Sequence, residues 1–169
     1  KWQAFFFIPL GAMQTCIVPV VSYNFAAGKY ERCKKTLKVA IGFGVALMMI
    51  GVVLFETIPG QMLHVFSHDP EVIRIGVVAF RFIGISFVPL VSSLTFPVFF
   101  QALGHAATSS ILTIIRTVFL FIPLAYLFSR FGLNWFWLTF PVTDSITTLA
   151  GYLFYRKFNK SMPSAAGEA

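Results

Sequence analysis

Apolar residues along this chain form long runs rather than the short alternation that is typical of a soluble domain. Five runs are each long enough to cross a bilayer, because a transmembrane helix needs about 20 mostly apolar residues. These runs cover about residues 3–24, 38–59, 72–102, 107–130 and 135–155. The pattern predicts an all-α fold, a polytopic transmembrane helix bundle of about five spans.

The composition supports the same fold class. The 169 residues are 57% hydrophobic and 11% charged, and they include 21 phenylalanines. An average soluble domain is about 25% charged. A soluble domain of this length could not bury so much apolar surface, so the solvent for most of the chain is expected to be lipid. The net charge of +7 comes from clusters between the apolar runs, which indicates membrane orientation and no nucleic-acid partner.

The basic residues define the expected topology. They gather between the first two runs and at the C-terminal end: Lys29, Arg32, Lys34, Lys35, Lys38, Arg156, Lys157 and Lys160. With five spans, the loop 25–37 and the C-terminus lie on one side, and the connection 60–71 on the other side has no Lys or Arg. The positive-inside rule makes the basic side cytoplasmic, with the chain in the plasma membrane. Cys33 would then face the cytoplasm, where a disulfide to Cys16 is not expected.

The ends of the chain give two further expectations. The first residue is Lys, and the sequence is apolar almost at once, so we expect it to be part of a longer protein. The last residues, "NKSMPSAAGEA", are mostly small and polar. They predict a disordered cytoplasmic tail at 159–169, after a transmembrane domain at 1–158.

Two charged residues are predicted to lie deep in the membrane. Asp144 is about ten residues, or roughly 15 Å of helix, from the outer end of its run, and Arg116 lies at a similar depth. An acid inside a membrane span is by default a functional candidate. Two roles remain open: a buried structural charge pair that neutralises both residues, or a part in coupling or gating.

Other polar residues in the runs have two possible roles. They could line a substrate cavity, or they could bond one helix to another. The cavity candidates are Gln14, Asn24, Ser86, Ser92 and Ser93, and Ser22 and Thr95 are further polar residues of this kind. The many aromatic rings suit cationic amphipathic compounds through cation–π contact, although they also suit a lipid-facing surface.

Enzyme chemistry has no candidate residues. There is no glycine-rich phosphate loop, no Ser/His/Asp grouping and no pair of carboxylates. His64 and His68 stand four residues apart, as metal ligands on a helix do, but no convincing third ligand accompanies them. We therefore expect no enzyme activity, no metal and no cofactor.

Four motifs, in order along the chain, resemble the C-terminal half of multidrug and toxic compound extrusion (MATE) transporters. The first is "YNFAAGKYERCKK", where Ala26 replaces a usual Gly, and the second is "FFQALGHA", with a Gln-x-x-Gly exit. In "ILTIIRTVFLFIPLAYLF", Arg116 precedes Pro123 by seven residues. In "FGLNWFWLTFPVTD", Gly-x-x-x-x-Trp is followed by Pro-x-x-Asp, which ends at Asp144.

The resemblance implies a twelve-helix protein with two six-helix lobes that face a central cavity. This chain would supply helices eight to twelve of that protein, and its partners would be membrane lipid, the missing N-terminal lobe and drug-like substrates. The whole would export amphipathic, often cationic compounds in exchange for H⁺ or Na⁺. The alternatives are a lipid-linked saccharide flippase of the same superfamily and a membrane scaffold subunit that does not transport.

The resemblance also bears on ion coupling. Family branches place a coupling carboxylate in the first helix of the N-terminal lobe, or in the seventh and tenth helices. The run that corresponds to the tenth helix has no acid from Val72 to Leu103. We therefore expect coupling to H⁺ or Na⁺ through residues outside this chain.

Overall fold

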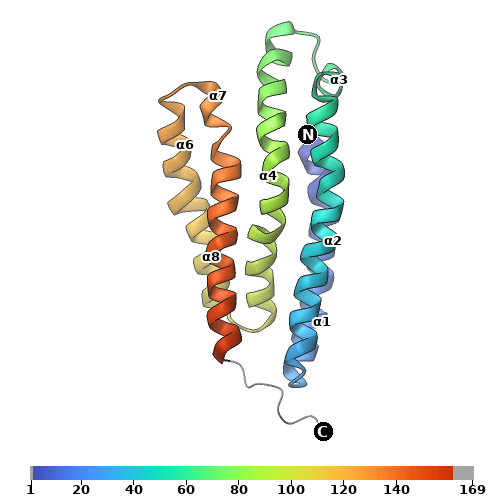
Figure 1. The fold of residues 1–169 in the computed structure, drawn as a ribbon, viewed down its shortest axis with the longest axis vertical. Coiled ribbons are helices and arrows are strands. Elements are labelled where there is room, and N and C mark those ends of the chain that lie inside the picture. The colour runs from blue at the N-terminus through green and yellow to red at the C-terminus, as the bar shows by residue number, and fades with distance from the viewer. Residues whose placement is uncertain (1, 162–169) are drawn as a thin grey trace.

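The computed structural model describes residues 2–161, and within this range every regular element is a helix (Figure 1). The predicted all-α transmembrane bundle is therefore confirmed. The elements are α1 (Trp2–Ala26), α2 (Tyr30–Thr57), α3 (Pro59–His64), α4 (Pro70–Ala102), α5 (Ala106–Ile114), the π-helix η1 (Ile115–Phe121), α6 (Ile122–Ser129), α7 (Leu133–Phe136) and α8 (Thr139–Ser161).

Four of the helical segments in the described range are long and apolar enough to cross a membrane. They are Ala4–Ala26, Tyr30–Thr57, Pro70–Ala102 and Ala106–Ser129. The fifth predicted run forms α8, which has 23 residues but falls short in composition. Four polar side chains of α8 are buried inside the bundle: Thr139, Thr143, Asp144 and Thr147. Figure 1 shows α8 alongside α4, so this polar face of α8 contacts protein rather than lipid.

The basic segment after α1 is mostly helical, so the predicted loop at 25–37 is wrong over most of its length. A tight turn at residues 27–29, with Gly28 at φ +72°, joins α1 to α2. Helix α2 then begins at Tyr30, several residues before the apolar run. Lys, Arg and Glu are good helix formers, so the helix continues beyond the apolar run. Within this first turn, Lys34 pairs with Glu31 at 2.7 Å.

Cys33 is buried, although it lies among basic residues on the side expected to be cytoplasmic. Its side chain is 0% exposed. Its Sγ lies 3.5 Å from the carbonyl oxygen of Val21, to which it donates a hydrogen bond. Because α1 and α2 are antiparallel neighbours, the face of α2 that carries Cys33 packs against the end of α1. Cys16 is the exposed thiol.

The first residues of the predicted C-terminal tail are helical. Helix α8 continues to Ser161, so residues 159–161 of the predicted tail are helical. The rest of the predicted disordered tail, residues 162–169, lies outside the described residues. The helix ends with a basic last turn, which includes Lys160. A cation at the C-terminus of a helix interacts favourably with the helix dipole.

Helix α4 is the centre of the bundle, and Figure 1 shows it between α8 and α2. Its aromatic side chains form much of one core cluster. Phe87 and Phe80 of α4 meet Phe55 of α2 edge to face, with ring centroids 5.1 and 4.5 Å apart. The segment α5–η1–α6 is much less buried, because Leu112 is its one fully buried residue. Polar contacts to α8 and α4 are therefore more important for holding this segment in place than they are for the other helices.

Candidate functional site

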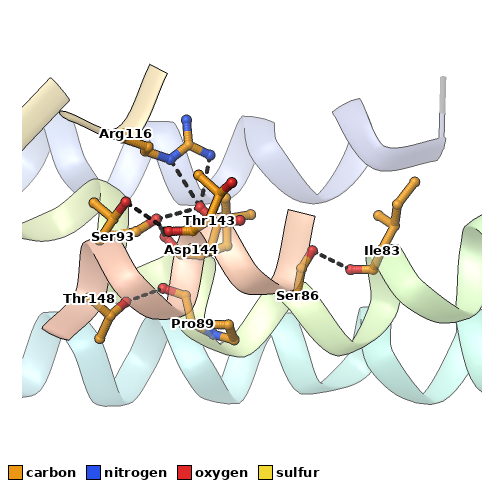
Figure 2. Close-up of polar contacts among 10 residues, drawn as sticks. Ile83, Ser86, Pro89, Ser93, Arg116, Thr143, Asp144 and Thr148 are labelled. Atoms are coloured by element: carbon orange, nitrogen blue, oxygen red, sulfur yellow. Dashed lines mark hydrogen bonds and ion pairs between the residues drawn. The ribbon is translucent and has the colours of Figure 1, made fainter. Parts of the chain in front are cut away.

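The most distinctive polar site in the bundle is an ion pair between Arg116 and Asp144 (Figure 2). Both Nε and Nη2 of Arg116 lie 2.9 Å from Oδ1 of Asp144. The hydroxyl of Ser93 also donates a hydrogen bond to this oxygen, at 2.9 Å. The site thus joins η1, α8 and α4. Such charge-assisted bonds are stronger than bonds between neutral groups.

The two charged side chains differ in their access to water. The side chain of Asp144 is 2% exposed, whereas that of Arg116 is 28% exposed. An isolated buried carboxylate is unfavourable unless a cation and hydrogen-bond donors compensate its charge. Arg116 and Ser93 supply that compensation. The guanidinium of Arg116 is therefore partly accessible to solvent, whereas the carboxylate of Asp144 is covered.

The position of Asp144 follows from a polar stripe on α8. Asp144, Thr147, Thr148 and Gly151 occupy one helix face, because they are three, four and seven residues apart. Thr148 donates a hydrogen bond to the carbonyl oxygen of Pro89 on α4 at 2.8 Å (Figure 2). Gly151 has no side chain, which allows α8 to approach α4 closely. The same contacts that pack α8 against α4 therefore fix Asp144 beside Ser93.

The position of Arg116 depends on a change of helix type. Arg116 is the second residue of the π-helix η1, and Pro123 follows two residues after η1 ends. Proline has no N–H, and its ring clashes with the carbonyl four residues earlier, here that of Phe119. The wider π-helical turn accommodates this defect. π-Helical turns are rare and frequently occur at functional sites.

A cavity of about 350 Å³ lies beside the ion pair. It combines the two charged side chains with hydroxyls and aromatic rings. Its lining residues are Phe7, Ser86, Leu90, Arg116, Thr117, Phe121, Phe140, Thr143 and Asp144. The hydroxyl of Thr143 is buried and has no hydrogen-bond partner within residues 2–161. Such a cavity can hold a compact amphipathic group and offer it both a polar and an aromatic wall.

The structure separates the predicted cavity residues. Ser86 lines the cavity, although its hydroxyl donates to the carbonyl of Ile83 at 2.7 Å, and Ser93 holds Asp144. Gln14 is half-buried on α1, and its Nε2 has no partner among the described residues. Asn24 donates to the carbonyl of Val20 and lines a different groove. Ser92 is half-buried and lines neither space.

Of the remaining polar candidates, Ser22 bonds one helix to another, and Thr95 bonds within its own helix. Ser22 of α1 donates a hydrogen bond to the carbonyl oxygen of Ala102 on α4, at 2.8 Å. Thr95 donates to the carbonyl oxygen of Val91 within its own helix, at 2.6 Å.

Among the described residues, no group of three or more His, Cys, Asp and Glu could hold a metal ion. The rings of His64 and His68 lie 6.1 Å apart between centroids.

Several cavity residues were missed in the sequence. Phe7, Phe140 and Thr143 line the cavity, and nothing in a run of apolar residues distinguishes the two phenylalanines from lipid-facing positions. The repeat of Thr139, Thr143 and Thr147 at four-residue spacing was an available signal. Threonines on one face of a membrane helix indicate that this face contacts protein rather than lipid.

A membrane-embedded bundle with a buried ion pair and an amphipathic cavity is typical of transport proteins. The sequence profile of the MatE family matches residues 2–127. This match covers well over half of the chain, so the chain belongs to the MatE family. The predicted membership is thereby confirmed.

Solved structures show the same fold. An inward-facing multidrug resistance MATE family transporter superposes with a TM-score of 0.89 at 18% identity, over 98% of this chain and 40% of that chain. An outward-facing MATE family transporter gives a TM-score of 0.88 at 19% identity, over 96% of this chain and 37% of that one.

A curated relative, an FAD transporter from Shewanella oneidensis, is 22% identical over 153 residues. The alignment covers 90% of this chain and 34% of the relative. The chain thus spans about a third of the length of this relative.

Proposed function

We propose that the chain forms most of the C-terminal lobe of a MATE transporter that exports amphipathic, often cationic, organic compounds across the plasma membrane. Export would be driven by exchange for H⁺ or Na⁺, with the coupling site outside these residues. The observation that carries this proposal is the cavity beside Arg116 and Asp144, inside a bundle with the MATE fold. The facing lobe would complete the cavity.

The lining of the cavity favours a cationic or neutral aromatic substrate. Arg116 is the one basic residue of the lining, and Asp144 neutralises it. The rings of Phe7, Phe121 and Phe140 supply faces that attract organic cations and stack on aromatic groups. A dianionic group would find a single arginine that is already paired. This point argues against a lipid-linked pyrophosphate as the substrate.

The similarity to both transporter conformations supports movement of the lobe as a rigid body. The TM-scores of 0.89 to the inward-facing form and 0.88 to the outward-facing form are nearly equal. Alternating access in many secondary transporters is rocking of one helical bundle against another around a fixed site. The ion pair would then keep α5–η1–α6 attached to α4 and α8 while the lobe moves.

A second candidate function is export of flavin nucleotides, which the FAD transporter from Shewanella oneidensis favours at 22% identity. An FAD molecule carries aromatic rings that could stack on the phenylalanines of the cavity. Its two phosphates would need additional cations, which the facing lobe would have to supply. The two functions therefore differ in the charge of the cargo.

Export assays separate the two candidates. Cells that lack their own efflux pumps should produce the chain together with the rest of the transporter, that is, the remaining helix of its lobe and the facing lobe. We expect lower accumulation of the cationic dye ethidium than in cells with an empty vector. Arg116→Gln and Asp144→Asn should each restore accumulation, whereas Arg81→Gln, at an exposed position of α4, should not. Secretion of FAD without any ethidium export would support the second candidate, and no export of either would contradict the proposed transport function.

A further inference from the structure

Helices α1 and α2 enclose a groove of about 670 Å³ on a face that does not include the ion-pair cavity. Its α1 side is formed by Met13, Cys16, Ile17, Val20 and Asn24, and its α2 side by Arg32, Lys35, Thr36, Val39, Ala40 and Phe43. Each set follows the three- and four-residue spacing of a single helix face. The groove is thus a continuous strip along two antiparallel helices that contact each other, with α1 behind α2 in the view of Figure 1.

The groove is polar at one end and apolar along the rest of its length. Arg32, Lys35, Thr36 and Asn24 gather near the turn at residues 27–29, because the two helices meet there. The opposite end, toward Met13 and Phe43, is apolar, and the side chain of Phe43 is 60% exposed. The groove therefore has the two-part character of a lipid: a charged group followed by a hydrocarbon chain.

The two cations of the groove are available to a ligand. Within residues 2–161, neither Arg32 nor Lys35 has a carboxylate partner. The neighbouring Lys34 behaves differently, since it is bound to Glu31 at 2.7 Å and does not line the groove. An arginine and a lysine three residues apart on a helix can approach a single phosphate together.

We propose that this groove binds an anionic phospholipid, with the phosphate between Arg32 and Lys35 and an acyl chain along the apolar strip. The length of the groove is appropriate for an acyl chain in one leaflet of a bilayer. From Arg32 to Phe43 the helix rises about 16 Å, close to half of the roughly 30 Å hydrocarbon core of a bilayer. Basic pockets between membrane helices are known to bind anionic headgroups. The inference does not depend on which compound is transported.

A second copy of the chain fits this groove less well. A symmetric dimer would place the same patch on both subunits, so Arg32 and Lys35 would face their own counterparts. Like charges brought together in a low-dielectric environment repel. A lipid phosphate instead compensates both cations, and its acyl chain needs no hydrogen-bond partners.

The exposed Cys16 lies in the apolar part of the groove and can report its occupancy. The second cysteine, Cys33, is 0% exposed, so it should not interfere. The chain in detergent is treated with N-ethylmaleimide, and modification of Cys16 is followed by mass spectrometry. Dioleoyl phosphatidylglycerol should slow the modification severalfold more than dioleoyl phosphatidylcholine does, because the tails are the same and only the headgroup charge differs.

Two variants and one soluble compound complete the test. The double variant Arg32→Gln/Lys35→Gln should abolish the difference between the two lipids, whereas Lys34→Gln, which removes a basic residue outside the groove, should preserve it. Glycerol phosphate, which has the headgroup chemistry but no tails, should not protect Cys16. The proposal would be overturned if both lipids protected Cys16 equally, or if the double variant kept the difference between the lipids. It would also be overturned if protection needed no lipid and rose with protein concentration.

Discussion

Removing either member of the Arg116–Asp144 pair should destabilise the bundle, and the two removals should differ in size. Arg116→Ala leaves Asp144, 2% exposed, with Ser93 as its one remaining polar partner within residues 2–161. Breaking a buried pair in this way costs about 3–5 kcal/mol. An independent scale gives roughly 2.5–3.5 kcal/mol for an aspartate at the centre of a membrane helix.

Asp144→Ala should have a smaller effect. The side chain of Arg116 is 28% exposed and lines the cavity, so the guanidinium can turn toward water once its partner is gone. The loss is then mainly that of hydrogen bonds to a charged group, about 1.5–3 kcal/mol. The double variant should be milder than the sum of the two single variants, because neither member of the pair is then left without its partner. A coupling energy of about 1–3 kcal/mol is expected.

The measurement is a double-mutant cycle on the unfolding free energy in detergent, for example by denaturant titration. Arg74→Ala is the matched control. It removes an arginine from an ion pair with Glu71 whose side chains are 78% and 74% exposed, with the charged atoms 3.7 Å apart. Exposed pairs contribute only about 0–1 kcal/mol. Strict additivity of Arg116→Ala and Asp144→Ala, or equal losses from both, would refute this account of the site.

Three further outcomes are expected. Gly151→Ala should lower stability by about 1–3 kcal/mol, because a Cβ there would lie 2.6 Å from Cδ2 of Phe96; Gly42→Ala, with no atom within 4 Å, should be neutral or slightly stabilising in the same unfolding assay. A cysteine introduced by Lys38→Cys in a Cys16→Ser background should react with a membrane-impermeant maleimide only after cells are permeabilised, and labelling of intact cells would reverse the proposed orientation; Cys33 should stay unreactive throughout. Residues 1–169 alone in liposomes should show no dye movement under an imposed H⁺ or Na⁺ gradient, because alternating access needs a facing lobe, and movement that depends on the gradient would disprove this.

The deep charged residues illustrate how far sequence reasoning could reach into the site. Arg116 and Asp144 could be singled out because charge is rare within apolar runs, and their similar depth suggested a pair. The third member, Ser93, was one of several serines with no distinguishing feature in the sequence. Its contact with Asp144 exists because Gly151 and Thr148 bring α8 against α4 at one particular height. Such a register depends on side-chain packing between helices distant in sequence.

The sequence by itself determined that the chain lies in a membrane, that its fold is all-α, and which family it belongs to. Apolar runs of membrane-spanning length leave few folds other than a helix bundle, because backbone groups in lipid must be satisfied within the segment. Only the tertiary structure decided which faces are buried. Cys33 is buried although its neighbours in the sequence are charged, and α8 buries a polar face although its length fits a membrane span. In lipid, apolar residues are suitable on both the protein and the lipid side, so hydrophobicity alone does not reveal which side chains turn inward; packing between helices does.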